Sequence, residues 1–221
     1  MSKTDTHGKS SKQSESGNRA PRLRFPGFEG EWEEKKLGEV FEKNEERNTD
    51  CTIGFDKTIS VATMVYNPSG NGAADESLRT YKVLRVGDIA FEGNKSKNFA
   101  YGRFVMNDIG VGIMSPRFRS LRPKTPLVVD FWKKLINYEP LMRSRLVNST
   151  KQGTMMNELI VDEILKQTVP VPSLPEQQKI AACLSEMDRL IAAQEQKVEA
   201  LRAHKKGMMQ RMFPEKRKGE L

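Results

Sequence analysis

The fold of this 221-residue chain is decided by residues 169–212, VPVPSLPEQQKIAACLSEMDRLIAAQEQKVEALRAHKKGMMQRM. From Glu176 to Met212 the apolar side chains recur at alternating spacings of four and three, which predicts one long helix with a coiled-coil seam. At 1.5 Å per residue this helix spans roughly 55 Å, longer than a small domain is wide. We therefore expect it to pack lengthwise against a helix of another copy or another protein. The seam consists of Ile180, Leu184, Met187, Ile191, Gln194, Val198, Leu201, Lys205, Met208 and Met212.

The entry to this helix has its own signature. Three prolines between Val169 and Pro175 favour a stiff, extended hinge, because each proline restricts its own φ and disfavours helix at the residue before it. Ser173 and Glu176 stand three apart and predict a capping box, with Pro175 in the first turn.

Upstream of the helix, the apolar pattern predicts an α+β domain. A short helix is expected over Glu31–Glu46 and a longer one over Asp130–Ser144, followed by a short helix and a strand that ends at Val169. Short β-branched segments separated by turn residues predict a sheet of several short strands. The expected strands are Thr58–Met64, Lys82–Val86, Ile89–Phe91, Arg103–Met106 and Val111–Met114.

These elements divide the chain into four parts. Residues 1–20 are polar, lack an apolar period and predict a disordered tail. Residues 21–169 are expected to form one globular domain with a short-stranded β-sheet and flanking helices. Residues 170–214 hold the long helix, and residues 215–221 form a basic tail.

The net charge of +8 is concentrated in particular segments. Residues 79–124 carry ten Lys or Arg against three acids, whereas residues 23–78 carry six against twelve. Binding to a polyanion such as DNA requires clustered basic side chains, because each bound phosphate must be neutralised. The local basic segment therefore favours a nucleic-acid partner.

The sequence contains no recognisable catalytic or metal-binding motif. It lacks a GxxxxGK[ST] phosphate loop, a GxGxxG turn, an HExxH helix and a GxSxG elbow. We expect a non-catalytic binding protein with no cofactor and no metal. No apolar run reaches the ~20 residues that span a bilayer, and the first 22 residues lack the apolar core of a signal peptide, so we expect a cytoplasmic protein with no membrane partner.

Several motifs resemble the specificity (S) subunits of type I restriction–modification systems. The hinge and helix entry, Val171-Pro-Ser-Leu-Pro-Glu-Gln-Gln-Lys-Ile-Ala181, carry this resemblance most specifically. The opening Pro21-Arg-Leu-Arg-Phe-Pro-Gly-Phe-Glu-Gly-Glu-Trp32, the segment Gly153–Met156 and the end Lys205–Pro214 are also similar to the family. Residues 50–125 match it only in layout.

The resemblance implies a target recognition domain over 21–169, followed by a conserved helical region that spaces two such domains. A full specificity subunit has two recognition domains and two antiparallel helices, and it binds methyltransferase subunits and, through them, restriction subunits. This chain has one of each, so it resembles a half-subunit that pairs with itself or with a second chain of the same type. A homodimer, paired through the seam, would read a two-part palindromic site in double-stranded DNA.

The residues expected to face DNA lie mostly in the basic segment. Arg and Lys suit phosphates and guanine, and Asn or Gln suits adenine. The candidates are Asn94, Lys95, Lys97, Asn98, Tyr101 and Arg103, with Arg79, Lys82 and Arg117 as phosphate contacts and Lys151 and Gln152 as further members. Two other classes stay open: a dimeric DNA-binding regulator, and a coiled-coil assembly adaptor without DNA affinity.

Overall fold

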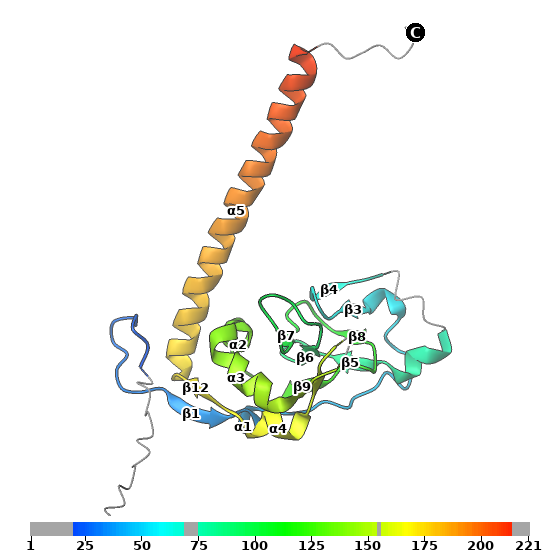
Figure 1. The fold of residues 1–221 in the computed structure, drawn as a ribbon, viewed down its shortest axis with the longest axis vertical. Helices are drawn as coiled ribbons and strands as arrows, with labels where there is room; N and C mark the ends of the chain where they lie inside the picture. The colour runs from blue at the N-terminus through cyan, green and yellow to red at the C-terminus, as the bar shows by residue number, and fades with distance from the viewer. Residues whose placement is uncertain (1–19, 69–74, 154–155, 214–221) are drawn as a thin grey trace, which may run out of the picture.

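The computed structural model describes residues 20–68, 75–153 and 156–213. A mixed α/β domain stands beside the lower part of one long helix, which projects well beyond it (Figure 1). The α+β fold class is confirmed. The expected tails at 1–20 and 215–221 lie almost entirely outside the described residues. Among the residues described, no helix is long and apolar enough to cross a membrane.

The long helix α5 runs from Leu174 to Met212, 39 residues, as its apolar period predicts. Ser173 occupies the N-cap position, and its carbonyl accepts the first helical hydrogen bond from the Gln177 amide at 2.9 Å. The expected capping box is wrong, because the Ser173 side chain makes no cap hydrogen bond. Glu176, its expected partner, instead binds Arg24.

The proline-rich hinge is built into the domain. Strand β12 (Thr168–Val171) pairs antiparallel with β1 (Glu33–Lys36), and Pro170 lies opposite Glu34. An edge strand tolerates proline because its outward-facing amide has no ladder partner to lose. The start of α5 is thereby held at a defined place on the domain.

The helix expected over Glu31–Glu46 is wrong in most of its length. The segment forms β1, a single turn α1 (Leu37–Val40) and strand β2 (Phe41–Lys43). Leu37 and Phe41 satisfy the helical spacing, yet both are buried in the core by this strand–turn–strand path. Pairing with distant strands outweighs a short helical pattern, because helices this short gain little from local hydrogen bonds.

The central sheet has the order β2-β9-β6-β7, all antiparallel. It comprises β6 (Ile89–Glu92), β7 (Arg103–Met106) and β9 (Ser120–Pro123) beside β2. Helix α2 (Val129–Asn137) packs on β7 and on α5. The main core forms between them, and the rings of Phe41 and Trp132 meet edge to face at 5.3 Å.

The expected helix Asp130–Ser144 is two helices. After α2, Tyr138 adopts an extended conformation and α3 (Glu139–Ser149) begins with Pro140 in its first turn. Proline favours the first turn of a helix, where its missing amide hydrogen would have no helical partner, so Pro140 marks the start of a new helix. The short helix α4 (Val161–Lys166) then leads into β12, as expected.

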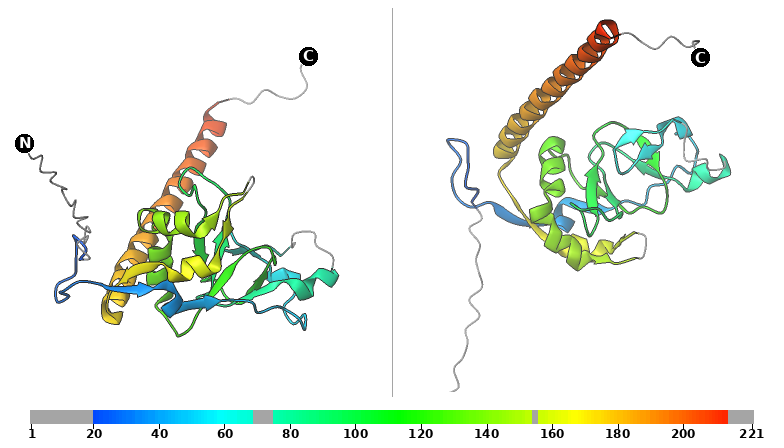
Figure 2. Two further views of the ribbon diagram at one scale, coloured as in Figure 1. Left: turned by 60° about the horizontal axis from the view of Figure 1, so that its bottom comes forward. Right: turned by 45° about the horizontal axis from the view of Figure 1, so that its top comes forward.

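A second lobe lies on the side of the sheet away from α5 (Figures 1 and 2). It contains strands β5 (Lys82–Leu84) and β8 (Gly112–Met114), which pair antiparallel, and the small hairpin β3 (Ile59–Ser60) and β4 (Val65–Tyr66). The 3-10 turns η1 (Phe55–Lys57) and η2 (Asp75–Thr80) complete it. The strand expected over Thr58–Met64 is shorter, because the chain turns at residues 61–64 and Met64 has a left-handed φ of 49°.

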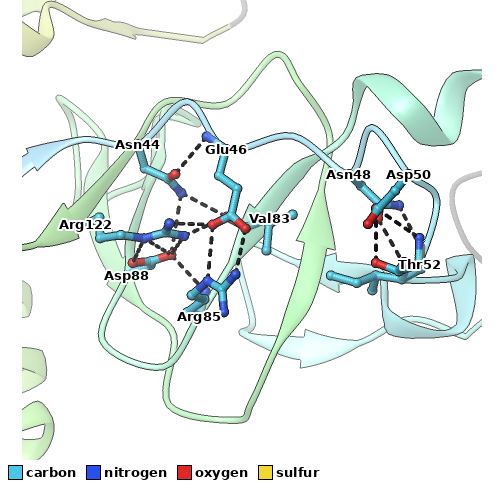
Figure 3. A network of polar contacts seen from close by, with 10 residues as sticks. Asn44, Glu46, Asn48, Asp50, Thr52, Val83, Arg85, Asp88 and Arg122 are labelled. Carbon is cyan, nitrogen blue, oxygen red and sulfur yellow. Dashed lines mark hydrogen bonds and ion pairs between the residues drawn. The ribbon is translucent and has the colours of Figure 1, made fainter.

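An ion-pair network joins the lobe to the central sheet (Figure 3). The Glu46 carboxylate accepts hydrogen bonds from Arg85, at 2.7 and 3.1 Å, and from Arg122. Arg122 also donates to the buried Asp88 at 2.7 Å. The Arg85 and Arg122 guanidinium groups lower the pKa of Glu46 to about 2, and Asp88 and Glu46 raise the pKa of Arg122.

Candidate nucleic-acid interface

Two segments far apart in the sequence form one exposed surface. The first is the loop 93–102 between β6 and β7, and the second is the hairpin of β10 (Thr150–Lys151) and β11 (Glu158–Leu159). The Asn157 amide donates to the Gly93 carbonyl at 2.9 Å, and Asn94 forms a β-bridge with Met156. We call these two segments together the paired loops.

Gly93 allows this close approach. A Cβ at Gly93 would lie 2.2 Å from the Asn157 carbonyl oxygen, inside any normal contact distance. Lys95 adds a second link, because its Nζ donates to the Gly153 carbonyl at 3.0 Å. The expected turn at Gly153-Thr154 lies partly outside the described residues.

The paired loops bring together most of the residues expected to face DNA. Asn94, Lys95, Lys97, Asn98, Lys151 and Gln152 are all exposed. The turn at Lys97 and Asn98 is closed by Ser96, whose Oγ accepts the Phe99 amide at 3.1 Å. A sequence reading could place each segment in a loop, but only the fold brings them side by side.

A cleft of about 290 Å³ opens between the hairpin and the sheet. Arg117 is exposed at this cleft, with its guanidinium 4.8 Å from the ring centre of Phe118. Arg119 also lines the cleft and pairs with Glu158 at 2.6 Å. Arg119 is not among the residues predicted from the sequence, where its one signal was its place in the basic segment two residues after Arg117.

Arg103 and Tyr101 are oriented by the protein itself. Arg103 Nη2 donates to the Ala62 carbonyl at 2.7 Å, and its guanidinium lies 4.9 Å from the ring centre of Phe99. Tyr101 is half-buried against the core. Arg103 links the start of β7 to the turn between β3 and β4, and Tyr101 anchors the end of the loop 93–102 on the core.

Two of the expected phosphate contacts lie elsewhere. Arg79 is exposed on η2, at the edge of the domain farthest from α5 in Figure 1. Lys82 is only 1% exposed, and its Nζ lies 3.6 Å from Glu45. Burial lowers the pKa of Lys82. Its placement at the surface was therefore wrong, because β5 turns this side chain inward, and Lys82 is left out of the interface.

The seam of α5 has two different surroundings. Ile180 and Leu184 are half-buried in the N-terminal turns of α5, which we call its foot. There Ile180 packs on the main core beside Ala181. Beyond them the seam is exposed: Met187, Ile191, Gln194, Val198, Leu201, Lys205, Met208 and Met212 face outward. The first two seam residues are therefore partly covered by the chain's own domain. The other seam residues have no packing partner within the described chain.

The foot of α5 is also fixed by charged groups. Lys134 of α2 donates to Asp188 of α5. Arg24 Nε and Nη2 each donate to the Glu176 carboxylate at 2.8 Å, and Trp32 Nε1 donates to it at 3.4 Å. These contacts fix the direction in which α5 leaves the domain.

Residues 29–203 match the family model of the type I restriction modification DNA specificity domain. The chain belongs to this family, and the resemblance to specificity subunits is confirmed. It is similar to two proteins of Methanocaldococcus jannaschii. One is the putative type I restriction enzyme MjaX specificity subunit, 25% identical over 203 residues, which cover 83% of this chain and 45% of the relative. The other is the MjaVIII specificity subunit, 29% identical over 102 residues, which cover 46% of this chain and 23% of the relative.

Solved structures show the same fold. The crystal structure of the HsdS subunit from Thermoanaerobacter tengcongensis has a TM-score of 0.52 and 21% identity, covering 93% of this chain and 54% of that one. A second structure, from work on complex assembly and conformational transition of the type I R-M system, has a TM-score of 0.52 and 18% identity, covering 91% and 53%. The chain spans about half the length of these relatives, with one recognition domain.

Proposed function

We propose that this chain is the double-stranded DNA recognition subunit of a type I restriction–modification complex. The observation that carries the proposal is the pairing of the loop 93–102 with the β10–β11 hairpin, which gathers exposed basic and amide side chains on one face of a domain of this family. Lys95, Lys97, Lys151 and Arg117 supply positive charge for phosphates. Asn94, Asn98 and Gln152 have the donor–acceptor pairs that adenine requires in the major groove.

The long helix supports an assembly role. An exposed apolar seam on a rod of 39 residues is a surface for another helix. In the proposed assembly two copies pair antiparallel through this seam and present two identical DNA readers at a set distance, which fits a two-part palindromic target. The chain itself performs no catalysis. It docks methyltransferase subunits and, through them, restriction subunits, in the cytoplasm.

DNA binding is tested with a charge-reversal pair in the paired loops. The double variant Lys95→Glu, Lys97→Glu should lose sequence-selective binding to duplexes selected from a random-sequence library, measured by fluorescence anisotropy. Lys36→Glu, at an exposed lysine at the end of β1, is a control with half the change in net charge and should bind as the wild type does. Equal affinity of all three proteins for the selected duplex would refute the proposed interface.

The assembly role is tested separately. Co-expression with a methyltransferase subunit should yield a stable complex that methylates adenine at the selected sequence. A chain that binds its target but never associates with a methyltransferase would instead be a DNA-binding regulator. A chain that associates without selecting any sequence would be an adaptor.

A further inference from the structure

An apolar groove runs along the foot of α5. Two adjoining cavities of about 690 and 370 Å³ share Pro21, Trp32, Ile180 and Leu184 in their walls. Leu23, which is 91% exposed, lines the smaller cavity, and this cavity reaches Met187 on α5. We call this surface the root groove. Its lining residues come from the N-terminal segment, α2 and α5, and Figure 1 and the right view of Figure 2 show α5 between the other two elements.

The opposite end of the same helix carries exposed apolar side chains that suit an apolar groove. Met208, Met209, Met212 and Phe213 are 48%, 49%, 70% and 64% exposed. Methionine side chains are unbranched and flexible, so they adapt to irregular apolar cavities. Ile180 and Met212 are about 48 Å apart along the helix at 1.5 Å per residue. The groove therefore cannot receive the end of its own helix.

We propose that the root groove is the socket for the C-terminal end of α5 of a second copy. The proposal rests on the antiparallel homodimer proposed above and specifies its register. The four-three spacing of the seam is symmetric about Gln196, so one antiparallel register keeps every seam residue opposite another. This register sets Ile180 against Met212, Leu184 against Met208, Met187 against Lys205, Ile191 against Leu201 and Gln194 against Val198 of the second copy.

The charges of the helix favour the same arrangement. Residues 176–195 hold four acids and two bases, a net charge of −2, and residues 196–213 hold one acid and five bases, a net charge of +4. An antiparallel pair lays the acidic half of one helix along the basic half of the other, whereas a parallel pair would place like halves together. Antiparallel helix dipoles also attract each other.

A second copy fits as the partner because both halves of the contact, the groove and the exposed helix end, are present in one chain. In a two-fold pair, each root groove receives the other helix end, so the contact is made twice. Each copy then covers the exposed Met208–Phe213 cluster of the other and closes both cavities.

A cysteine pair tests the register directly. In a chain carrying Cys51→Ser and Cys183→Ser, the double variant Leu184→Cys, Met208→Cys should form an intermolecular disulfide under mild oxidation. The single variant Leu184→Cys should not. If the single variant Leu184→Cys forms a disulfide-linked dimer, the two helices pair in parallel and the proposal is refuted.

A charge at the helix end tests the socket. Met212→Asp should raise the dimer dissociation constant by about tenfold or more, measured by sedimentation equilibrium, because it places a carboxylate in an apolar groove. Gln210→Asp adds the same charge on the opposite face of the same turn and should leave the constant unchanged. Trp32 emission should shift to the red on dilution of the wild type, and this shift should be absent in Trp32→Phe.

The outcomes separate the socket from the dimer itself. A wild-type protein that is monomeric at every concentration would refute the proposed homodimer, and the socket with it. A wild-type dimer that Met212→Asp leaves intact would refute the socket alone and leave the dimer standing.

Discussion

Arg24 and Glu176 form a bidentate ion pair across 152 positions of sequence, with Nε and Nη2 each 2.8 Å from a different carboxylate oxygen. The Glu176 side chain is only 2% exposed, and Trp32 adds a hydrogen bond to the same carboxylate. Glu176 also raises the pKa of Arg24. One buried carboxylate thereby attaches the N-terminal segment to the foot of the long helix, and this contact forms one wall of the root groove.

Replacing this carboxylate should loosen the foot of α5. We expect Glu176→Gln to lower the free energy of unfolding by about 1–3 kcal/mol, because the largely buried guanidinium of Arg24 loses its carboxylate partner. Urea denaturation followed by circular dichroism measures the loss. Glu186→Gln, on an exposed part of the same helix, is the control and should change stability by less than about 0.5 kcal/mol. Equal effects of the two variants would contradict the role given to Glu176.

The Glu46 network should make the domain sensitive to acid. Arg85 and Arg122 hold the pKa of Glu46 at about 2, below its ordinary value of 4.5, so the unfolded chain binds a proton first as pH falls. The resulting stabilisation is complete above pH 4.5 and disappears as pH falls to about 2. We expect Glu46→Gln to cost about 1–2 kcal/mol at pH 7, allowing for screening at a partly exposed site.

Urea unfolding of both proteins across this range tests the idea. The difference in stability between wild type and Glu46→Gln should narrow below pH 4.5 and close near pH 2. A difference that stays constant with pH would show that the network contributes no titrating interaction.

Lys82 should prove dispensable for DNA binding. Its ammonium group is buried against a partly exposed Glu45, and burial lowers its pKa. Lys82→Met keeps the length of the side chain and removes a desolvated charge, so we expect equal or greater stability at pH 7 and unchanged DNA affinity. Any stability advantage of the variant should shrink toward pH 10.5, because the unfolded lysine then binds more protons than the folded one and wild-type stability rises. A loss of DNA affinity in Lys82→Met would return this residue to the interface.

Gly93 should be required for the paired loops. A methyl group there meets the Asn157 carbonyl, so Gly93→Ala must separate the loop 93–102 from the hairpin. We expect DNA affinity to fall by about tenfold or more, equivalent to about 1.4 kcal/mol. Gly207→Ala is the control, since a methyl group there meets nothing within 4 Å and alanine favours helix. Binding assays with the selected duplex compare the two, and equal affinities would refute the pairing as a requirement.

Some parts of the fold were predictable because their signals are local. The strands near 82–86, 89–91, 103–106 and 111–114 follow from β-branched residues between turns, and the structure contains all four. Other elements were decided by distant partners. Lys82 lies on a correctly predicted strand but is buried, since all three residues of β5 are covered and the covering comes from segments distant in the sequence.

The helix entry shows the same division within a few residues. The heptad spacing and the prolines predicted a rigid helix that starts near Glu176, two residues after its observed start at Leu174, and carries an apolar stripe, because both signals depend only on the geometry of the chain itself. The tertiary structure decided the partner of Glu176. Arg24, near the other end of the chain, binds its carboxylate, and the capping box expected with Ser173 does not form. The tertiary structure likewise decided that Ile180 and Leu184 line a groove while Met187 to Met212 stay exposed. Exposure depends on what packs alongside, and no spacing in one segment contains that information.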